Sequence, residues 1–275
     1  MKNIILILFI CTQSLLAQSK RFTYEYRFVP DSTNKQNVLK EPMFLDIGNK
    51  ISIFSSQRKY ISDSTIIADS KQGKFGMPPS DLIILYRIEK IDGKVFYKTN
   101  DYGLDRIKVD DDRKIEWKVL PDKQKIGEFN TQKAVTNFGG RRWTAWFTTE
   151  IPLQDGPYKF QGLPGLIIKI EDSTNSHSFE LAEISNLKEI GYPERGKETK
   201  ETSFNLADFK KYYLQYRNDP GANVKKLYTE GRLPDFTDTS GNFHTGAETV
   251  RNVEKLAIER LKKDNNIIEL ELLKK

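Results

Sequence analysis

The chain has 275 residues, with 44 Lys and Arg against 38 Asp and Glu, a formal net charge of +6 and one cysteine. Charged residues make up 30% and aromatic residues 11%, which excludes an integral membrane protein and argues against a disordered chain. Because opposite charges are interspersed and no arginine-rich tract stands out, the positive balance does not indicate nucleic-acid binding.

Residues 1–17 have the pattern of a secretory signal peptide. A single lysine precedes the apolar run 4–10, and a small residue, Ala17, ends the segment. The apolar run is too short to cross a membrane as a helix. Cleavage after Ala17 would remove Cys11, which leaves no disulfide, thiol nucleophile or thiolate metal ligand. We expect an exported protein in the periplasm, at the outer membrane or in the medium, with one domain over residues 18–275 and no transmembrane segment.

Alternating apolar and polar residues predict antiparallel strands over the first two thirds of the mature chain. The alternation runs through Phe22–Phe28, Met43–Ile47, Ile51–Ile53, Leu82–Ile91, Val95–Tyr97 and Ile115–Val119. Asp92-Gly93 is a strong hairpin signal, and Asp110-Asp111-Asp112 is interpreted as a solvated turn. Residues 56–79 favour a short helix followed by a loop.

Helical spacing replaces the strand pattern late in the chain. Asn205 is an expected N-cap for a helix that carries Phe209 and Tyr213 on one face, and Thr245 with Glu248 predicts the start of another. Apolar alternation over 268–272 predicts a final strand. The fold class is therefore α+β and mainly antiparallel β, with a strongly curved sheet of half-barrel or open-barrel type and a few late helices.

The region 132–172 holds the most informative residues. Gly139-Gly140 predicts a hairpin whose second strand carries Trp143 and Trp146 on opposite faces. Such a strand is covered on both sides, or one indole lies at a binding surface. Tyr158 and Phe160 follow on the next segment. These four aromatic residues are the candidates for ligand binding, and core packing is the alternative.

A short apolar motif follows these aromatic residues. It consists of Gly162, Leu163, Pro164, Gly165, Leu166 and Ile167. Proline at the second and glycine at the third position of Leu163–Leu166 predict a type II turn, which leads into a half-buried strand. Such a turn needs only backbone geometry, so a structural role is the simplest interpretation.

The run 142–148, the segment 155–160 and the hexapeptide 162–167 together resemble the signature of the GLPGLI family of exported bacterial proteins. The resemblance covers about residues 18–187. It implies a secreted β-rich protein but no activity, because the family has no established biochemical function. Its setting among outer-membrane transport proteins implies work in the cell envelope. Members often have cysteine where Thr131 stands, so no disulfide or metal role of that position carries over.

Residues for catalysis or metal binding are few. The two histidines, His177 and His244, have no partner at metal-ligand spacing, and we predict neither a metal nor a cofactor. Glu150 or Asp155 could pair with Asp172 as general acid and base on a glycosidic bond, with aromatic residues stacked on the sugar. The alternative is that these acids cap turns at strand ends.

The sequence favours a non-enzymatic envelope protein that binds or carries an apolar ligand, such as a lipid, or a partner segment, and it leaves catalysis open. One alternative is an accessory subunit that docks on an outer-membrane transporter of the TonB-dependent type, through residues 76–79 or the hexapeptide. A carboxylate-based carbohydrate hydrolase is the other.

Overall fold

The computed structural model describes residues 19–103, 106–196, 199–237 and 241–274. The predicted signal peptide and Cys11 lie outside the described residues. The strands of the large sheet are β1 (Lys20–Phe28), β2 (Leu39–Gly48), β3 (Ile51–Ser56), β4 (Tyr86–Ile91), β5 (Lys94–Thr99), β6 (Arg106–Asp111), β7 (Lys118–Ile126), β8 (Phe129–Phe138), β9 (Arg141–Thr148), β10 (Leu166–Asp172), β11 (His177–Asn186) and β12 (Glu201–Asn205). The other elements are α1 (Gln57–Lys71), α2 (Leu206–Asn218), α3 (Ala222–Thr229), α4 (Gly246–Lys262), the 3-10 helix η1 (Leu270–Leu273) and a small ribbon of β13 (Phe236–Thr237) and β14 (Phe243–His244). No helix among the described residues is long and apolar enough to cross a bilayer.

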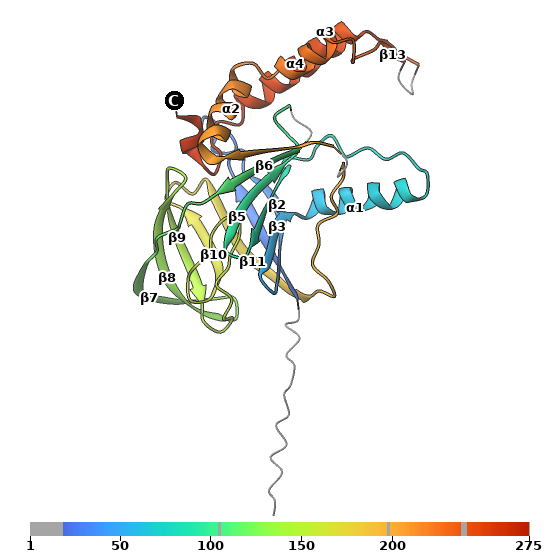
Figure 1. The fold of residues 1–275 in the computed structure, drawn as a ribbon. Coiled ribbons are helices and arrows are strands. Elements are labelled where there is room, and N and C mark those ends of the chain that lie inside the picture. Colours follow the sequence, from blue (N-terminus) through green and yellow to red (C-terminus); the bar gives the residue numbers. More distant parts are fainter. Residues whose placement is uncertain (1–18, 104–105, 197–198, 238–240, 275) are drawn as a thin grey trace, which may run out of the picture.

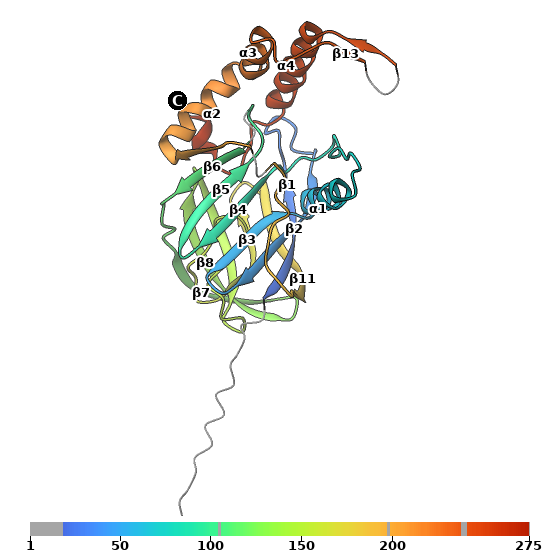
Figure 2. The same ribbon diagram turned by 45° about the vertical axis from the view of Figure 1, so that its right-hand side comes forward.

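The twelve strands form one sheet in the order β12-β6-β5-β4-β3-β2-β1-β11-β10-β9-β8-β7. Every neighbouring pair is antiparallel except β12 with β6, and β12 and β7 are the two edges. The sheet curves so strongly that β7–β9 lie across from β3–β6, while α2, α3 and α4 gather beyond one end of the strands (Figures 1 and 2). The predicted α+β class with a mainly antiparallel, open, curved sheet is confirmed.

The core lies on the concave side of the sheet and is rich in aromatic residues. Strand β1 pairs with β2 and β11 at the centre of the strand order, and its four aromatic residues, Phe22, Tyr24, Tyr26 and Phe28, are all buried. Tyr24 donates a hydrogen bond of 2.7 Å to the carbonyl of Ile167 in β10. The predicted aromatic face of this strand is therefore the inner face of the sheet.

Local signals position several turns and caps as predicted. Asp92 and Gly93 both have positive φ, which is the type I′ geometry that suits a two-residue hairpin between β4 and β5. The side chains of Asn205 and Thr245 accept hydrogen bonds from the first turns of α2 and α4. These caps satisfy backbone N–H groups that have no partner within the helix.

Helix α1 is longer than the predicted short helix, because tertiary contacts outweigh its weak helix propensity. Lys59 and Asp63, one turn apart, form a buried ion pair of 2.7 Å. Asp63 also accepts a hydrogen bond from Tyr192 and lies 3.1 Å from the guanidinium of Arg195. The helix is thus held by a distant segment of the chain.

Two sequence interpretations are wrong, and in both cases a contact with a residue far away in the sequence determines the local structure. Residues 268–272, predicted as a final strand, are irregular at 268–269 and then enter η1, because the carbonyls of Ile267 and Ile268 accept hydrogen bonds from Arg141 instead of from a strand. Asp111, predicted in a solvated turn, ends β6 and is buried against Arg113 and Lys159.

The hexapeptide also differs from the predicted type II turn. The N–H of Gly165 bonds the carbonyl of Leu163 at 2.8 Å, which is a three-residue turn, and the N–H of Leu166 bonds Ile151 instead. A Cβ at Gly165 would overlap the carbonyl of Thr148. The requirement for glycine therefore comes from the close approach of two backbone segments.

We predict that Gly165→Ala destabilises the fold by about 1–3 kcal/mol, because the methyl group would have to push apart buried backbone at Thr148. Urea unfolding measures the change. Gly191→Ala is the matched control, since nothing lies within 4 Å of its would-be Cβ. Equal midpoints for the two variants would contradict the argument.

Candidate functional site

Residues 149–165, which we name the plug segment, connect β9 to β10 and fill the concave side of the sheet. Lys90 in β4 donates hydrogen bonds to Asp155 at 2.5 Å and to the carbonyls of Gly156 and Phe160 at 2.8 and 3.1 Å. Burial lowers the pKa of Lys90, and the Asp155 carboxylate opposes this change. The plug segment therefore bridges strands that are far apart in the sheet order.

A buried ionic cluster holds the next part of the plug segment. The ammonium of Lys159 lies 2.7 Å from Asp111 in β6 and 2.5 Å from Glu269, and Arg113 lies 2.6 Å from Glu269. Tyr158 donates a hydrogen bond of 2.6 Å to Glu269. Burial would raise the pKa of Glu269, but Lys159 and Arg113 outweigh burial and hold the pKa below its ordinary value.

A cavity of about 460 Å³ lies beside this cluster, at the end of the sheet that α2 and the C-terminal segment cover. Its walls include inner-face residues of β1 and β4–β6, the extended segment 80–85, the plug segment, helix α2 and residues 260–272. The main apolar and aromatic lining residues are Tyr26, Phe28, Leu39, Leu82, Ile83, Ile84, Tyr86, Tyr97, Tyr102, Val109, Tyr158, Leu206, Phe209, Tyr213, Ile267, Ile268 and Leu272. Such a lining suits an apolar molecule.

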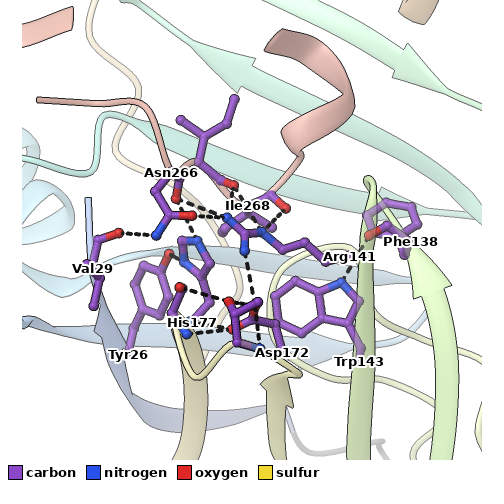
Figure 3. A network of polar contacts seen from close by, with 12 residues as sticks. Tyr26, Val29, Phe138, Arg141, Trp143, Asp172, His177, Asn266 and Ile268 are labelled. Atoms are coloured by element: carbon purple, nitrogen blue, oxygen red, sulfur yellow. Dashed lines mark hydrogen bonds and ion pairs between the residues drawn. The ribbon is translucent and has the colours of Figure 1, made fainter. Parts of the chain in front are cut away.

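A second polar network fixes the C-terminal segment to the sheet (Figure 3). Arg141 in β9 binds Asp172 at 3.0 Å and the side-chain oxygen of Asn266 at 2.6 Å. Because the carbonyl of Asn266 can only accept, His177 Nε2 carries a proton and donates to it at 2.8 Å. Nδ1 of His177 then accepts from the Tyr26 hydroxyl at 2.7 Å.

The four aromatic candidates from the sequence lie in three different environments. Trp143 and Phe160 are fully buried, and their rings meet edge to face at 4.8 Å, which is core packing. Trp146 is half-buried on the opposite face of β9, with the ammonium of Lys133 5.7 Å from its ring. Tyr158 lines the cavity, so the structure places one of the four residues at a site with room for a ligand.

The three carboxylates of the hydrolase alternative bind different partners. Glu150 is exposed and accepts hydrogen bonds from Asn130, while Asp155 binds Lys90. Asp172 is buried and accepts from Arg141, Thr174 and the backbone of residues 174, 176 and 177. No hydrogen bond or ion pair within the described residues joins two of the three. No group of three metal-ligating side chains occurs in the described part of the chain.

Sequence reasoning missed most of the cavity wall. Tyr86 and Tyr97 were interpreted only as strand residues, and Phe209 and Tyr213 only as the apolar face of a helix. The available signal was the clustering of aromatic residues on strand and helix faces that the patterns predict to be buried. No local pattern indicates which of those faces meet around a space.

Comparisons with known proteins match a short part of the chain to an uncharacterised family. Residues 139–169 match a family model described as a protein of unknown function (Porph_ging), and this stretch includes the hexapeptide 162–167. No curated protein matches the chain. Among solved structures, PNGF-II in the P21 and C2 space groups is similar, with 17% identity over 71% of this chain and TM-scores of 0.48 and 0.49. This chain covers only about a third of PNGF-II (33% and 32%).

We predict that His177 makes stability depend on pH on the acid side. Burial, and then the charge of Arg141, lower the pKa of His177 to about 3, so the folded protein keeps it neutral. The unfolded chain binds a proton near pH 6.5, so stability is full above that pH and falls as the pH drops towards 3. We expect the wild type to lose about 1–2 kcal/mol more than His177→Gln between pH 7 and 5.

Urea unfolding at each pH measures this difference, since most carboxylates stay ionised in that window. The other histidine, His244, lies in β14 outside the network of Figure 3. His244→Gln is therefore the matched substitution, and it should keep the pH dependence of the wild type. Parallel stability curves for the wild type and His177→Gln would show that His177 does not carry the dependence.

Proposed function

We propose that this protein binds and carries an apolar small molecule in the cavity between the open end of the curved sheet, helix α2 and the C-terminal segment. The cavity itself is the observation that carries the proposal. Its volume, about 460 Å³, lies within the range of about 300–1,000 Å³ usual for small-molecule sites. A concave, mainly apolar surface of this size that is partly open to solvent suits a small-molecule ligand.

The distribution of charge around the cavity supports the same proposal. The charged side chains deep in its wall, Lys159 and Glu269, are paired with each other. Arg260, on α4, binds Asp101 at 2.9 Å. Asp81, Lys263 and Asp264 also line the cavity, but most of the remaining lining is aromatic or aliphatic and would gain free energy by excluding water on contact with an apolar ligand.

The proposal includes a location in the cell envelope, which rests on the predicted signal peptide. An exported protein with a deep apolar site could shield most of a hydrophobic molecule from water while that molecule crosses an aqueous compartment. The curved sheet, open at one end and covered there by helices, is suited to this role. A lipid or another apolar ligand thus stays the first hypothesis.

A second candidate, docking on an outer-membrane transporter, has one observation in its favour. Phe75 and Met77 are 91% and 76% exposed on the loop after α1, whereas Leu163, Leu166 and Ile167 of the hexapeptide are buried. Large exposed apolar side chains in one loop mark an interaction surface. The loop, not the hexapeptide, is therefore the contact surface we propose for this alternative.

We predict that the purified protein binds the neutral dye Nile red saturably, with a rise in fluorescence, and that Leu82→Trp weakens this binding at least tenfold. Leu82 lines the cavity from the extended segment 80–85, where an indole would occupy ligand space without disturbing a strand. Titration of the dye into each variant measures the effect. Mass spectrometry of organic extracts should also reveal a co-purifying apolar molecule.

Leu187→Trp is the matched control, because Leu187 is also half-buried but does not line the cavity. It should keep the affinity of the wild type. Lack of saturable dye binding by the wild type, or equal losses in the two variants, would rule out the cavity as the binding site.

For the docking alternative, we expect the double substitution Phe75→Ser and Met77→Ser to abolish co-purification with a TonB-dependent transporter from detergent-solubilised envelopes. Phe243→Ser is the control, since Phe243 is 63% exposed but lies on β14. A protein that stays free of any transporter in the wild-type form would count against this alternative, and dye binding should be unaffected by all three changes.

A further inference from the structure

The mouth of the cavity is polar. The lining residues that are exposed to solvent are Asn37, Ser80, Asp81, Ile83, Arg260 and Lys263. Two half-buried carboxylates, Asp101 and Asp264, also belong to the lining. Because exposed side chains border the solvent, this set marks the side on which the cavity opens. A ligand therefore meets mostly charged, amide and hydroxyl groups where it enters.

Two carboxylates of the mouth are neutralised by arginine. Asp81 binds Arg58 at 2.6 Å. Asp101 binds Arg260 at 2.9 Å, and Arg260 itself lines the cavity. Neither pair leaves an excess charge at the mouth, so a charged head group of a ligand would have to compete with an existing partner at both positions.

The two remaining charges of the mouth have opposite signs. The ammonium of Lys263 and the carboxylate of Asp264 are neighbours in the chain, and neither has an ion pair within the described residues. Behind them, Asp31 lies near Lys263 and Arg217 near Asp264, again one charge of each sign. The mouth as a whole is therefore close to neutral and favours neither an anion nor a cation.

The interior of the cavity is apolar, and its polar side chains are already bound. Its buried lining includes Phe28, Ile84, Val109, Phe209, Ile268 and several tyrosine rings. The buried polar lining residues with a hydrogen bond to the protein are Thr99, Lys159, His177, Asn266 and Glu269. The hydroxyl of Tyr86 has none, but protein atoms cover it, so no ligand can reach it. A polar ligand group in the interior would lose its water and find these side chains already paired.

We propose that the cavity binds an amphiphile, with one hydrocarbon chain in the apolar interior and the polar head at the mouth in contact with water, and that the mouth does not select for the charge of the head. This inference rests on the proposed function and gives its ligand a chemical class and an orientation. The volume of about 460 Å³ lies in the lower half of the range of about 300–1,000 Å³ usual for small-molecule sites, which favours one chain over two.

Competition against bound Nile red tests the orientation with three ten-carbon compounds: decan-1-ol, decyl maltoside and decane-1,10-diol, each below its critical micelle concentration. We expect decyl maltoside to match decan-1-ol within about threefold, since its large head stays in water. The diol should need a concentration about tenfold higher, because one of its hydroxyl groups has to be buried without a partner. Equal displacement by the diol and the alcohol, or failure of the maltoside to displace the dye, would overturn the orientation.

A change of charge at the mouth tests where the head lies. Decanoate and decylammonium at pH 7.5 should displace the dye from the wild type within about threefold of each other, and a larger preference would overturn the balance of charge. Lys263→Glu should then favour decylammonium over decanoate by about tenfold at low salt and leave decyl maltoside unchanged. Each compound is compared with the dye affinity of the same variant.

Lys188→Glu is the matched control, because Lys188 is also exposed but follows β11 at the opposite end of the sheet. It makes the same change in net charge and should keep the ratio of the wild type. An unchanged ratio in Lys263→Glu, or an equal shift in both variants, would mean that the head does not lie at the mouth.

The outcomes also distinguish this inference from the proposed function. If the diol binds as well as the alcohol, or if Lys263→Glu has no effect on the ratio, the orientation is wrong but the cavity still binds apolar molecules. Only a wild-type protein that fails to bind Nile red would remove both proposals.

Discussion

Lys159 is the side chain on which three distant parts of the chain depend. It belongs to the plug segment, and its ammonium binds Asp111 of β6 and Glu269 of the C-terminal segment. The edge strands β12 and β7 do not pair with each other, so side chains and the plug segment must hold the concave side of the sheet together. Loss of one partner from a buried ion pair costs about 3–5 kcal/mol, because the other charge is left unpaired and buried. These ionic contacts therefore add to the aromatic core in joining β6, the plug segment and the C-terminal segment.

The same contacts shape the wall of the cavity. Tyr158, next to Lys159 in the chain, gives its hydroxyl to Glu269 and its ring to the cavity wall. The charges are neutralised within the protein, and the aromatic surface is left for an apolar molecule. Helix α2 and residues 264–272 complete the wall, and the network of Arg141 and His177 fixes the latter to the sheet. Polar contacts therefore build the frame of an apolar site.

Features that depend on neighbouring residues could be predicted from the sequence. The alternation of Phe22–Phe28, the turn at Asp92-Gly93 and the caps at Asn205 and Thr245 are all decided within a few residues. Asp111 and the segment 268–272 were misinterpreted because their partners are remote, as with Arg113 and Glu269, which are 156 residues apart. The same limit applies to the candidate site. Its wall joins β4, α2 and the C-terminal segment, and no local pattern says that these faces surround a space.

The hexapeptide has a structural role, and none of its six residues lines the cavity. Gly165 lets the chain pass close to the backbone of Thr148, and the buried side chains of Leu163, Leu166 and Ile167 anchor the two ends of the turn. This arrangement directs the plug segment across the sheet and places Tyr158 and Lys159 at the cavity. Most of the lining, including Tyr86, segment 80–85 and α2, lies outside the matched stretch 139–169. The family match therefore concerns the backbone frame around the hexapeptide, and most of the cavity wall is built by other parts of the chain.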